Sequence, residues 1–465
     1  MRVVIVGAGE VGYHVIGALY REGVDIVAVD NDDGVLEQLR QEFNLTTIQG
    51  NAIDPSIFEQ AKAADADLFI AVTNYDETNI IACMMASEAG VQKKIARVKT
   101  IDFRQQASFS DSKSLGIDLI INPYEVAAEH LANVINTPNV TDYSQFLDGR
   151  LLLLRIPLPA NCPLVGQRVL DYGQSSGMKN SLIAVIRRDG NAFIPTATEV
   201  LQENDAVYFF VEKTQVKKLF QYLELRDKPP RRVFINGGGH IGYALAKRLE
   251  ADHLDVRILE ISEQRCMDLS RQLEDTLVLN VDGNDAKALR SEGVDHADFF
   301  ISLTAADEIN IVSCLQAKAL GVRNTVALVK QPELIHPLMK NKGIDIAFSP
   351  RLLTARRILQ FTRGRNLDSF YSFTSSDIEL LELAVDTPMA CTEKPLAELG
   401  LPPGILLGAV KRGKDIFVPR GGDQVRVGDT ILLLQQRRNR RFTRTFFLEK
   451  QPIEGEPESS VVAPG

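Results

Sequence analysis

Short apolar runs alternate with amphipathic stretches over the first 140 residues of the chain. Five runs rich in β-branched residues are typical of strands and lie at 3–6, 26–29, 68–72, 95–98 and 119–121. Apolar positions recur at helical spacing in 11–20, 78–89 and 124–136. This alternation predicts an α/β domain with a mostly parallel, doubly wound sheet, and the last helical stretch is expected to lead out of that sheet.

Residues from about 150 to 225 follow a different pattern, with short β-rich runs and turn signals. The runs are LLLLRI at 151–156 and AVYFFV at 206–211, and Arg188-Asp189-Gly190 is one of the turns. A segment of this composition and length predicts a small α+β module after the parallel sheet.

The second half of the chain repeats the first. GAGEVG at 7–12 returns as GGGHIG at 237–242, and DLFIAVTNYDETNIIAC at 67–83 returns as DFFISLTAADEINIVSC at 298–314. GIDLIINP at 116–123 returns as GIDIAFSP at 343–350. Matches in the same order at a nearly fixed offset indicate a tandem duplication, whose halves are called copy 1 and copy 2 below.

Each copy carries a G-x-G-x-x-G loop between a predicted strand and a predicted helix, as in dinucleotide-binding domains. Gly7 and Gly237 would allow the tight turn, and Gly9 and Gly239 would let the backbone approach a pyrophosphate. The third glycine of each motif would let the helix sit close to the sheet. The fold class expected is therefore α/β: a tandem duplication in which each copy is a Rossmann-like, doubly wound parallel sheet followed by a small α+β module.

The predicted domain boundaries follow from these patterns. They are 1–140 and 231–365 for the sheet domains, 141–227 and 366–442 for the modules, and 443–465 for a disordered tail. RDKPPRR at 226–232 is expected to link the copies. RRNRRFTR at 437–444 could contact anionic lipid or an acidic partner, although a solvated terminal segment is favoured.

Asp30 and Glu260 each follow the last glycine of their loop by 18 residues, at the end of the next strand. A carboxylate there would accept hydrogen bonds from a ribose diol and would repel a 2′-phosphate. The pattern thus favours NAD(H) or an adenosine nucleotide over NADP(H). A Rossmann-like domain that has lost its ligand stays an alternative for either copy.

The two copies differ where a fifth strand ends. Arg97 in copy 1 could contact phosphates, whereas its counterpart in copy 2 is Leu328. Unequal ligand binding by the two copies is therefore expected.

Charge and cysteine usage narrow the function classes further. The chain has 465 residues, and 52 basic residues against 61 acidic ones give a net charge of −9, which argues against a nucleic-acid partner. No apolar stretch is long enough to cross a bilayer, and no signal peptide precedes the first glycine motif. The five cysteines show no zinc spacing, so we expect a cytoplasmic protein with buried packing thiols and no metal site.

The combination of these motifs resembles the TrkA family, the peripheral subunits of bacterial Trk potassium uptake systems. The resemblance rests on GAGEVG, Asp30, AVTNYDETN, IARVK, the β-rich module and the second copy, and it covers about residues 1–440. The signature T-x-x-D-E-x-N at 73–79 recurs at 304–310. The family's sheet domain is the regulator-of-potassium-conductance (RCK) N-domain, and its small module is the RCK C-domain.

The resemblance implies a nucleotide-binding regulator rather than an enzyme. Such subunits lie on the cytoplasmic face of a TrkH or TrkG potassium-translocating protein, form homotetrameric gating rings, and bind NAD(H) and ATP/ADP. Carried onto this sequence, the binding positions in copy 1 are Gly7, Ala8, Gly9, Glu10, Val11, Asp30, Asn51, Thr73, Asn74 and Arg97. Those in copy 2 are Gly237, Gly238, Gly239, His240, Ile241, Glu260, Asp282, Thr304 and Ala305.

Two other function classes stay open. An NAD-dependent oxidoreductase would account for the glycine loops, but the sequence shows no general acid/base pair facing the crevice. A redox-sensing DNA-binding regulator would need a basic recognition helix, which the acidic balance does not favour.

Overall fold

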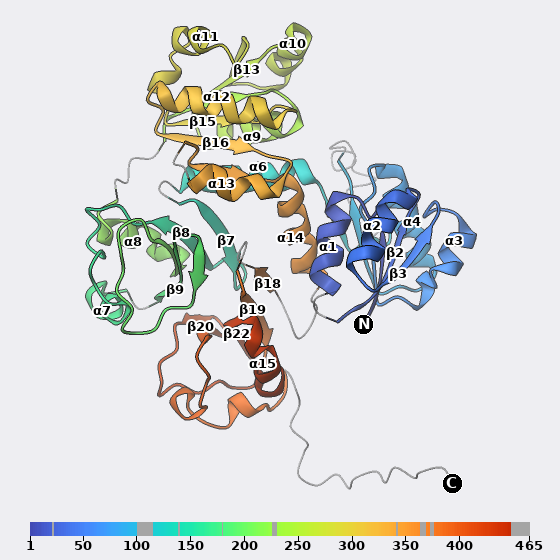
Figure 1. Ribbon diagram of the computed structural model, residues 1–465, viewed down its shortest axis with the longest axis vertical. Coiled ribbons are helices and arrows are strands. Elements are labelled where there is room, and N and C mark those ends of the chain that lie inside the picture. Colours follow the sequence, from blue (N-terminus) through green and yellow to red (C-terminus); the bar gives the residue numbers. More distant parts are fainter. Residues whose placement is uncertain are drawn as a thin grey trace. The chain divides into compact units, whose positions relative to one another are not determined.

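The computed structural model in Figure 1 describes residues 1–20, 23–99, 115–137, 140–178, 180–225, 230–340, 343–362, 369–372 and 376–447. The chain divides into two compact units. Unit 1, Met1–Thr141 and Lys228–Thr362, contains the sheet domains of both copies. Unit 2, Asp142–Asp227 and Arg363–Gly465, contains both small modules.

The sheet domain of copy 1 is a six-stranded parallel sheet with the order β3-β2-β1-β4-β5-β6. Its strands are β1 (Arg2–Val6), β2 (Asp25–Asp30), β3 (Thr46–Gln49), β4 (Leu68–Ala71), β5 (Lys93–Arg97) and β6 (Leu119–Ile121). The strand order reverses between β1 and β4, which is where ligands bind in doubly wound sheets.

Copy 2 has the same sheet, in the order β14-β13-β12-β15-β16-β17. Its strands are β12 (Arg232–Asn236), β13 (Asp255–Glu260), β14 (Leu277–Asn280), β15 (Phe299–Ser302), β16 (Asn324–Leu328) and β17 (Ile346–Phe348). The identical order of two sheets confirms the predicted duplication of a doubly wound fold.

Apolar cores lie on both faces of each sheet, where helices cover the strands. The helices that follow one another in copy 1 are α1 (Glu10–Tyr20), α2 (Asp33–Glu42), α3 (Pro55–Gln60), α4 (Asp76–Glu88) and α6 (Pro123–Asn136). In copy 2 they are α9 (His240–Ala251), α10 (Glu263–Gln272), α11 (Ala286–Ser291), α12 (Asp307–Ala319), α13 (Ile335–Lys340) and α14 (Pro350–Thr362).

The last helix of each sheet domain packs on the other copy. Ile358 and Leu359 of α14 belong to the apolar core of the copy 1 sheet, and α14 lies against α1 (Figure 1). In return, Leu131 and Ile135 of α6 belong to the core of the copy 2 sheet, where α6 packs on α9. Burying such side chains contributes roughly 1.5–3 kcal/mol each, so the exchanged helices join the two sheet domains firmly.

An N-cap residue, Asn122, fixes where α6 begins. The side chain of Asn122 accepts hydrogen bonds from the backbone N–H groups of Tyr124 and Glu125, and Pro123 occupies the first turn. The helix therefore begins directly after β6 and leads out of its own sheet, as the sequence predicts. Its apolar face is explained by the copy 2 core.

Unit 2 consists of two antiparallel five-stranded sheets with the orders β10-β9-β11-β8-β7 and β18-β19-β22-β20-β21. The first contains β7 (Asp142–Phe146), β8 (Leu151–Pro157), β9 (Ser181–Arg188), β10 (Asn191–Phe193) and β11 (Ala206–Glu212), with helices α7 (Val169–Ser175) and α8 (Val216–Tyr222). The second contains β18 (Ser369–Ser372), β19 (Ile378–Ala384), β20 (Ile405–Arg412), β21 (Asp415–Phe417) and β22 (Asp429–Gln436), with helix α15 (Arg440–Phe447).

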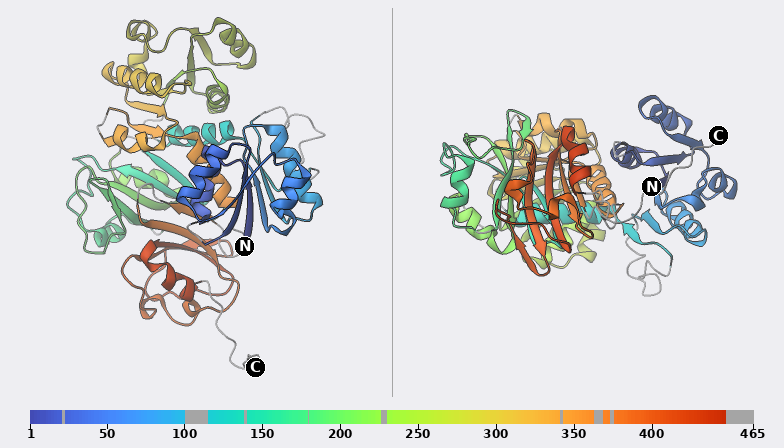
Figure 2. Two further views of the ribbon diagram at one scale, coloured as in Figure 1. Left: turned by 45° about the vertical axis from the view of Figure 1, so that its right-hand side comes forward. Right: turned by 90° about the horizontal axis from the view of Figure 1, so that it is seen from below.

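The two modules share one apolar core, to which both sheets contribute. Phe146 and Phe210 of the first sheet pack with Ile378 and Leu432 of the second. Figure 2 shows these sheets, coloured teal to green and orange to red, side by side within unit 2. The apolar core of each α+β module is thus completed by side chains of the other module.

The structure corrects the predicted tail and the basic cluster before it. Residues 443–447, predicted to begin a disordered tail, form the end of α15, and Phe447 is buried. Arg437 and Arg440 form ion pairs with Glu379, whose carboxylate is buried, so these two arginines are not merely solvated. Residues 448–465, and 226–229 of the predicted linker, lie outside the described residues.

Candidate functional site

The glycine loop of each copy lies where the sheet reverses its strand order. Gly7 follows β1 with a φ of +92°, and a Cβ built there would lie 2.6 Å from the backbone nitrogen of Thr73. Gly237 follows β12 with a φ of +104°, and its Cβ would lie 3.1 Å from the backbone nitrogen of Thr304. Both loops therefore pack closely on the end of the neighbouring strand, β4 or β15, and the positive φ favours glycine at both positions.

The third glycine of each loop brings the helix close to the turn. A Cβ on Gly12 would lie 1.9 Å from the carbonyl oxygen of Gly7, and a Cβ on Gly242 would lie 2.2 Å from that of Gly237. The second glycines are different: around Gly9 and Gly239, no heavy atom of the described chain, apart from the adjacent residues, lies within 4 Å of the added Cβ. These two positions leave open space above the loop, which a phosphate could approach.

The predicted ribose-binding carboxylates also hold the glycine loops. Asp30 accepts hydrogen bonds from the backbone N–H of Ala8 at 2.6 Å and from that of Asp32 at 3.0 Å. Glu260 accepts equivalent bonds from Gly238 at 2.8 Å and from Ser262 at 2.9 Å. A carboxylate oxygen has two lone pairs, so both side chains keep acceptor capacity for a diol.

The repeated T-x-x-D-E-x-N signature builds the opposite wall. Buried Asn79 accepts from the backbone N–H of Thr73 at 2.8 Å and donates to the carbonyl of Arg97 at 2.8 Å. Asn310 makes the same bonds to Thr304, at 2.8 Å, and to Leu328, at 3.0 Å. The conformation of the two strand ends is therefore fixed by the last residue of the signature, an asparagine to which the sequence analysis assigned no role.

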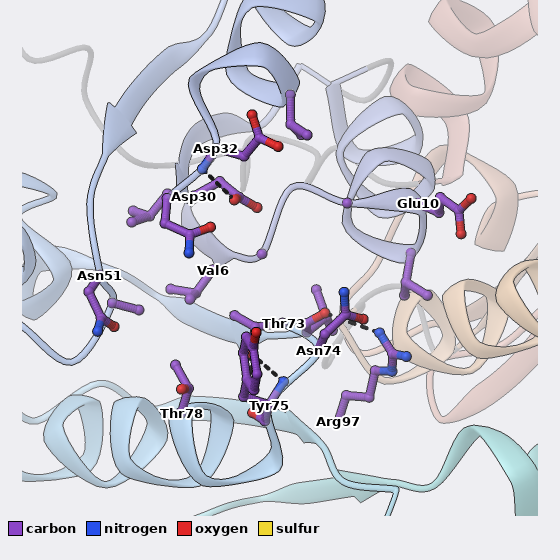
Figure 3. Close-up of a pocket in the computed structure, with 18 of the residues that line it drawn as sticks. Val6, Glu10, Asp30, Asp32, Asn51, Thr73, Asn74, Tyr75, Thr78 and Arg97 are labelled. Atoms are coloured by element: carbon purple, nitrogen blue, oxygen red, sulfur yellow. Dashed lines mark hydrogen bonds between the residues drawn. The ribbon is translucent and has the colours of Figure 1, made fainter.

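The pocket formed by these parts in copy 1 has a volume of about 600 Å³. The predicted residues that line it are Gly7, Gly9, Glu10, Val11, Asp30, Asn51, Thr73, Asn74 and Arg97, while Ala8 is buried. Figure 3 shows Asp30 and Asp32 along one side, Asn51 at one end, and Glu10 and Arg97 toward the other end. The pocket is thus lined by carboxylates and by a cation, which suits a ligand that carries both a ribose diol and phosphates.

Among the residues of this pocket, Arg97 gives the clearest indication that an anion binds there. Its Nη1 donates to the carbonyl of Val72 at 3.3 Å, but its Nε is buried and has no hydrogen-bond partner within the described residues. Burial lowers the pKa of the guanidinium from its ordinary value. A desolvated cation with an unsatisfied donor is costly, and a phosphate at its side would satisfy it.

Nearby Lys99 adds positive charge at the same strand end. Its ammonium donates to the carbonyl of Asn74 at 2.9 Å, and burial is the main reason why its pKa is lowered. The pocket itself offers backbone N–H groups, a helix start and the cation Arg97 to a phosphate, and acceptors to a ribose, so the residues present fit an NAD or adenosine-nucleotide ligand.

Copy 2 places the counterparts at the same sheet edge but with different chemistry. Buried Leu328 ends β16 where Arg97 ends β5. His240 stacks on Tyr124 of α6, with ring centroids 4.7 Å apart. Arg265 donates to the carbonyl of Gly238 at 2.8 Å. The predicted binding residues Gly239, Ile241, Thr304 and Ala305 lie at the loop and at the end of β15, and Asp282 follows β14, where it accepts from Asn284.

One of the copy 1 pocket residues that the sequence analysis did not predict belongs to copy 2. Arg351, the second residue of α14, lines this pocket although it belongs to copy 2, and it forms an ion pair with Glu10. Its counterpart in copy 1 is Tyr124, so the repeat gives no signal for an arginine there. Only the exchange of helices brings it into the pocket.

The five cysteines are buried, which confirms that they are packing residues. Burial raises the pKa of Cys314 to about 12 and that of Cys391 to about 11, so both thiols stay protonated at neutral pH. Among the described residues, no group of three or more His, Cys, Asp or Glu side chains is arranged to hold a metal ion. None of the described helices is long and apolar enough to span a membrane.

Comparison with known proteins gives consistent family matches. A TrkA-N domain model matches residues 3–123 and 233–350, and a TrkA-C domain model matches 153–224 and 380–446. The Trk system potassium uptake protein TrkA of Halomonas elongata is 31% identical over 452 residues, which cover 96% of this chain and 98% of the relative. The protein of the same name from Vibrio alginolyticus is 29% identical over 93% of this chain and 95% of its own length.

Solved structures show the same fold. The GsuK channel bound to NAD has a TM-score of 0.61 at 20% identity and covers 96% of this chain and 78% of that chain. The crystal structure of the GsuK RCK domain has a TM-score of 0.60 at 21% identity, over 96% of this chain and 94% of that chain. At this identity the likeness establishes the architecture of tandem sheet domains and modules.

Proposed function

This chain belongs to the TrkA family, and from that premise we propose that it is a nucleotide-binding regulatory subunit of a potassium uptake system. The observation that carries the proposal is the copy 1 pocket, where an open glycine loop faces the desolvated, incompletely bonded guanidinium of Arg97. These features suit binding of a phosphate rather than chemistry on it.

The ligands proposed are NAD(H) and ATP/ADP. Asp30 would accept from the ribose diol, the loop around Gly9 and the cation Arg97 would hold the phosphates, and Asn51 would lie near the adenine end. Thr73 and Asn74 would flank the crevice in which the other half of a dinucleotide lies. In copy 2 the equivalent roles fall to the loop at Gly237–Ile241 and to Glu260, Asp282, Thr304 and Ala305, with weaker phosphate binding because Leu328 carries no charge.

A regulator of this kind needs no catalytic group. A ligand that binds two conformations of an assembly with different affinity shifts their balance, and a shift from 1:99 to 99:1 takes about 5.5 kcal/mol of differential binding. Several pockets in one assembly would share that requirement. We therefore propose that the chain is not an enzyme and that nucleotide binding alone changes transport.

The partners proposed are a TrkH- or TrkG-type potassium-translocating subunit, at the inner face of the cell membrane, and further copies of this chain in a homotetrameric gating ring. Apolar stripes on both copies support self-association. On α12, Ile309, Val312 and Leu315 are each at least 40% exposed, and on α4, Ile81 and Met84 form the corresponding stripe. Exposed apolar side chains at helical spacing favour burial against another subunit.

The test is an equilibrium titration of the purified chain with NADH, ATP, ADP and NADPH, with the nucleotide content assayed after incubation. Two matched variants, Gly9→Asp and Gly239→Asp, place a carboxylate in the open space of one loop at a time. The proposal predicts binding of NADH or ATP/ADP without consumption, lost copy by copy in the two variants. Catalytic consumption of NADH, or a preference for NADPH, would refute it and favour an oxidoreductase.

A further inference from the structure

Two pairs of residues connect the copies at equivalent places, and their chemistry differs. At the copy 1 loop, Glu10 forms an ion pair with Arg351 from the start of α14. At the copy 2 loop, the counterpart His240 stacks on Tyr124 from the start of α6. An arginine of copy 2 therefore enters the copy 1 pocket, whereas at the equivalent place in copy 2 an aromatic ring of copy 1 packs on the loop.

We propose that Arg351 is a phosphate-binding residue that copy 2 contributes to the copy 1 pocket, and that Glu10 holds it until a terminal phosphate takes its place. The proposal rests on the nucleotide binding proposed above and assigns a residue that decides between nucleotides with different numbers of exposed phosphates.

Geometry and burial support the exchange of partners. Arg351 lines the pocket together with Gly9 and Arg97, and its side chain is 29% exposed, whereas that of Glu10 is 58% exposed. The carboxylate is thus the more solvated half of the pair and loses less when the pair opens. Partial burial also lowers the pKa of Arg351, so the guanidinium benefits from any strong anionic partner.

Charge explains why the response would depend on the ligand. Glu10 and Arg351 together carry no net charge, so a pyrophosphate whose ends are both esterified, as in NAD, gains little from the pair. A terminal phosphate carries extra negative charge and free oxygens, which a guanidinium can bind through two parallel hydrogen bonds. Arg351 would then move from Glu10 to the phosphate, and Glu10 would turn to solvent.

Movement of the Arg351 side chain from Glu10 to a phosphate would also affect copy 2. Besides its ion pair, Arg351 donates from Nη1 to the carbonyl of Lys330 at 3.2 Å, and Lys330 follows β16. Ile358 and Leu359, farther along α14, are fixed in the core of copy 1. Occupation of the copy 1 pocket by a terminal phosphate is thereby coupled to the end of a copy 2 strand.

The experiment compares the affinities of the full chain for ATP and for AMP, in a Gly239→Asp background that blocks the copy 2 loop. Gly239 has an ordinary φ of −65°, so the added side chain is tolerated there. Arg351→Gln is expected to lower the ratio of ATP to AMP affinity about 10- to 150-fold, the range that one charge-assisted hydrogen bond gives. Glu10→Gln is expected to raise it severalfold, and the double variant should behave like Arg351→Gln alone.

The control is Arg248→Gln. Arg248 also belongs to copy 2 and forms an ion pair of 2.6 Å with a copy 1 glutamate, Glu125, but it does not line the pocket. It should leave the ratio unchanged. The proposal is overturned if Arg351→Gln weakens ATP and AMP equally, or if Glu10→Gln still raises the ratio in the absence of Arg351. Failure of the unaltered chain to bind any nucleotide would instead refute the function proposed above.

Discussion

Replacement of Arg97 by leucine separates the binding role of this residue from a structural one. Copy 2 carries leucine at the equivalent place, where Leu328 is buried and 6% exposed, so Arg97→Leu installs a side chain that this fold already accommodates. If Arg97 had a structural role, its removal would destabilise the protein. If its role is to bind an anion, its removal would not destabilise the ligand-free protein.

The magnitude follows from the bonds that Arg97 makes without a ligand. A buried, unsatisfied donor costs about 1–3 kcal/mol, and the bond from Nη1 to the carbonyl of Val72, at 3.3 Å, returns about 0.5–1.5 kcal/mol. Arg97→Leu should therefore leave the stability of the ligand-free chain unchanged or raise it by about 1 kcal/mol. In the same variant, loss of a charge-assisted bond to phosphate should weaken ATP or NADH binding about 10- to 150-fold.

The assay is a thermal unfolding scan with and without nucleotide, combined with a binding titration. The expected result is a melting temperature equal to or above that of the unaltered chain without ligand, and a much smaller upward shift with ligand. Leu328→Arg is the reciprocal variant and should lower the ligand-free melting temperature, because it buries an uncompensated charge. A variant Arg97→Leu that melts earlier without ligand and binds nucleotide normally would refute this reasoning.

Three further predictions concern packing, ionisation and assembly. Gly12→Ala should destabilise copy 1 by about 2 kcal/mol or more, because its Cβ would lie 1.9 Å from the carbonyl oxygen of Gly7, whereas Gly9→Ala, with an open surrounding in the described chain, should change the melting temperature little. The pKa of Cys314 is raised to about 12, so the unfolded chain ionises first and the free energy of unfolding should fall by up to about 1.4 kcal/mol per pH unit above pH 9 in alkaline denaturation curves. Cys314→Ala should remove that part of the slope, and its persistence would contradict the assignment. Val312→Lys places a charge on the exposed stripe of α12 and should lower the mass measured by light scattering; an unchanged assembly would exclude that stripe as an interface.

The sheet domains could be predicted from the sequence because their signals are local. A strand, a glycine loop and a helix follow one another within 20 residues at Arg2–Val6 and Glu10–Tyr20, and the repeat shows the same pattern twice. Short-range geometry also explains the role of Gly12, whose added Cβ would meet the carbonyl oxygen of Gly7. The residues that line the copy 1 pocket, apart from Arg351, all belong to the sheet domain of copy 1.

The remaining features depend on contacts between distant segments. The apolar face of α6 is visible in the sequence, but its packing on α9 is not, because one amphipathic helix can cover either its own sheet or another. The entry of Arg351 into the copy 1 pocket follows from that exchange. Likewise, α15 reaches into the predicted tail as far as Phe447, because this side chain is buried in the apolar core of the second module.

Potassium uptake in membranes that contain the transport subunit tests the central claim most directly. Uptake would be measured with this chain present or absent, and with ADP exchanged for ATP at constant total nucleotide. The account predicts an uptake rate that depends on the nucleotide only when the chain is present, and a response that moves to about 10- to 150-fold higher nucleotide concentration with Arg97→Leu. An uptake rate and a nucleotide response that are unchanged when the chain is left out would contradict it.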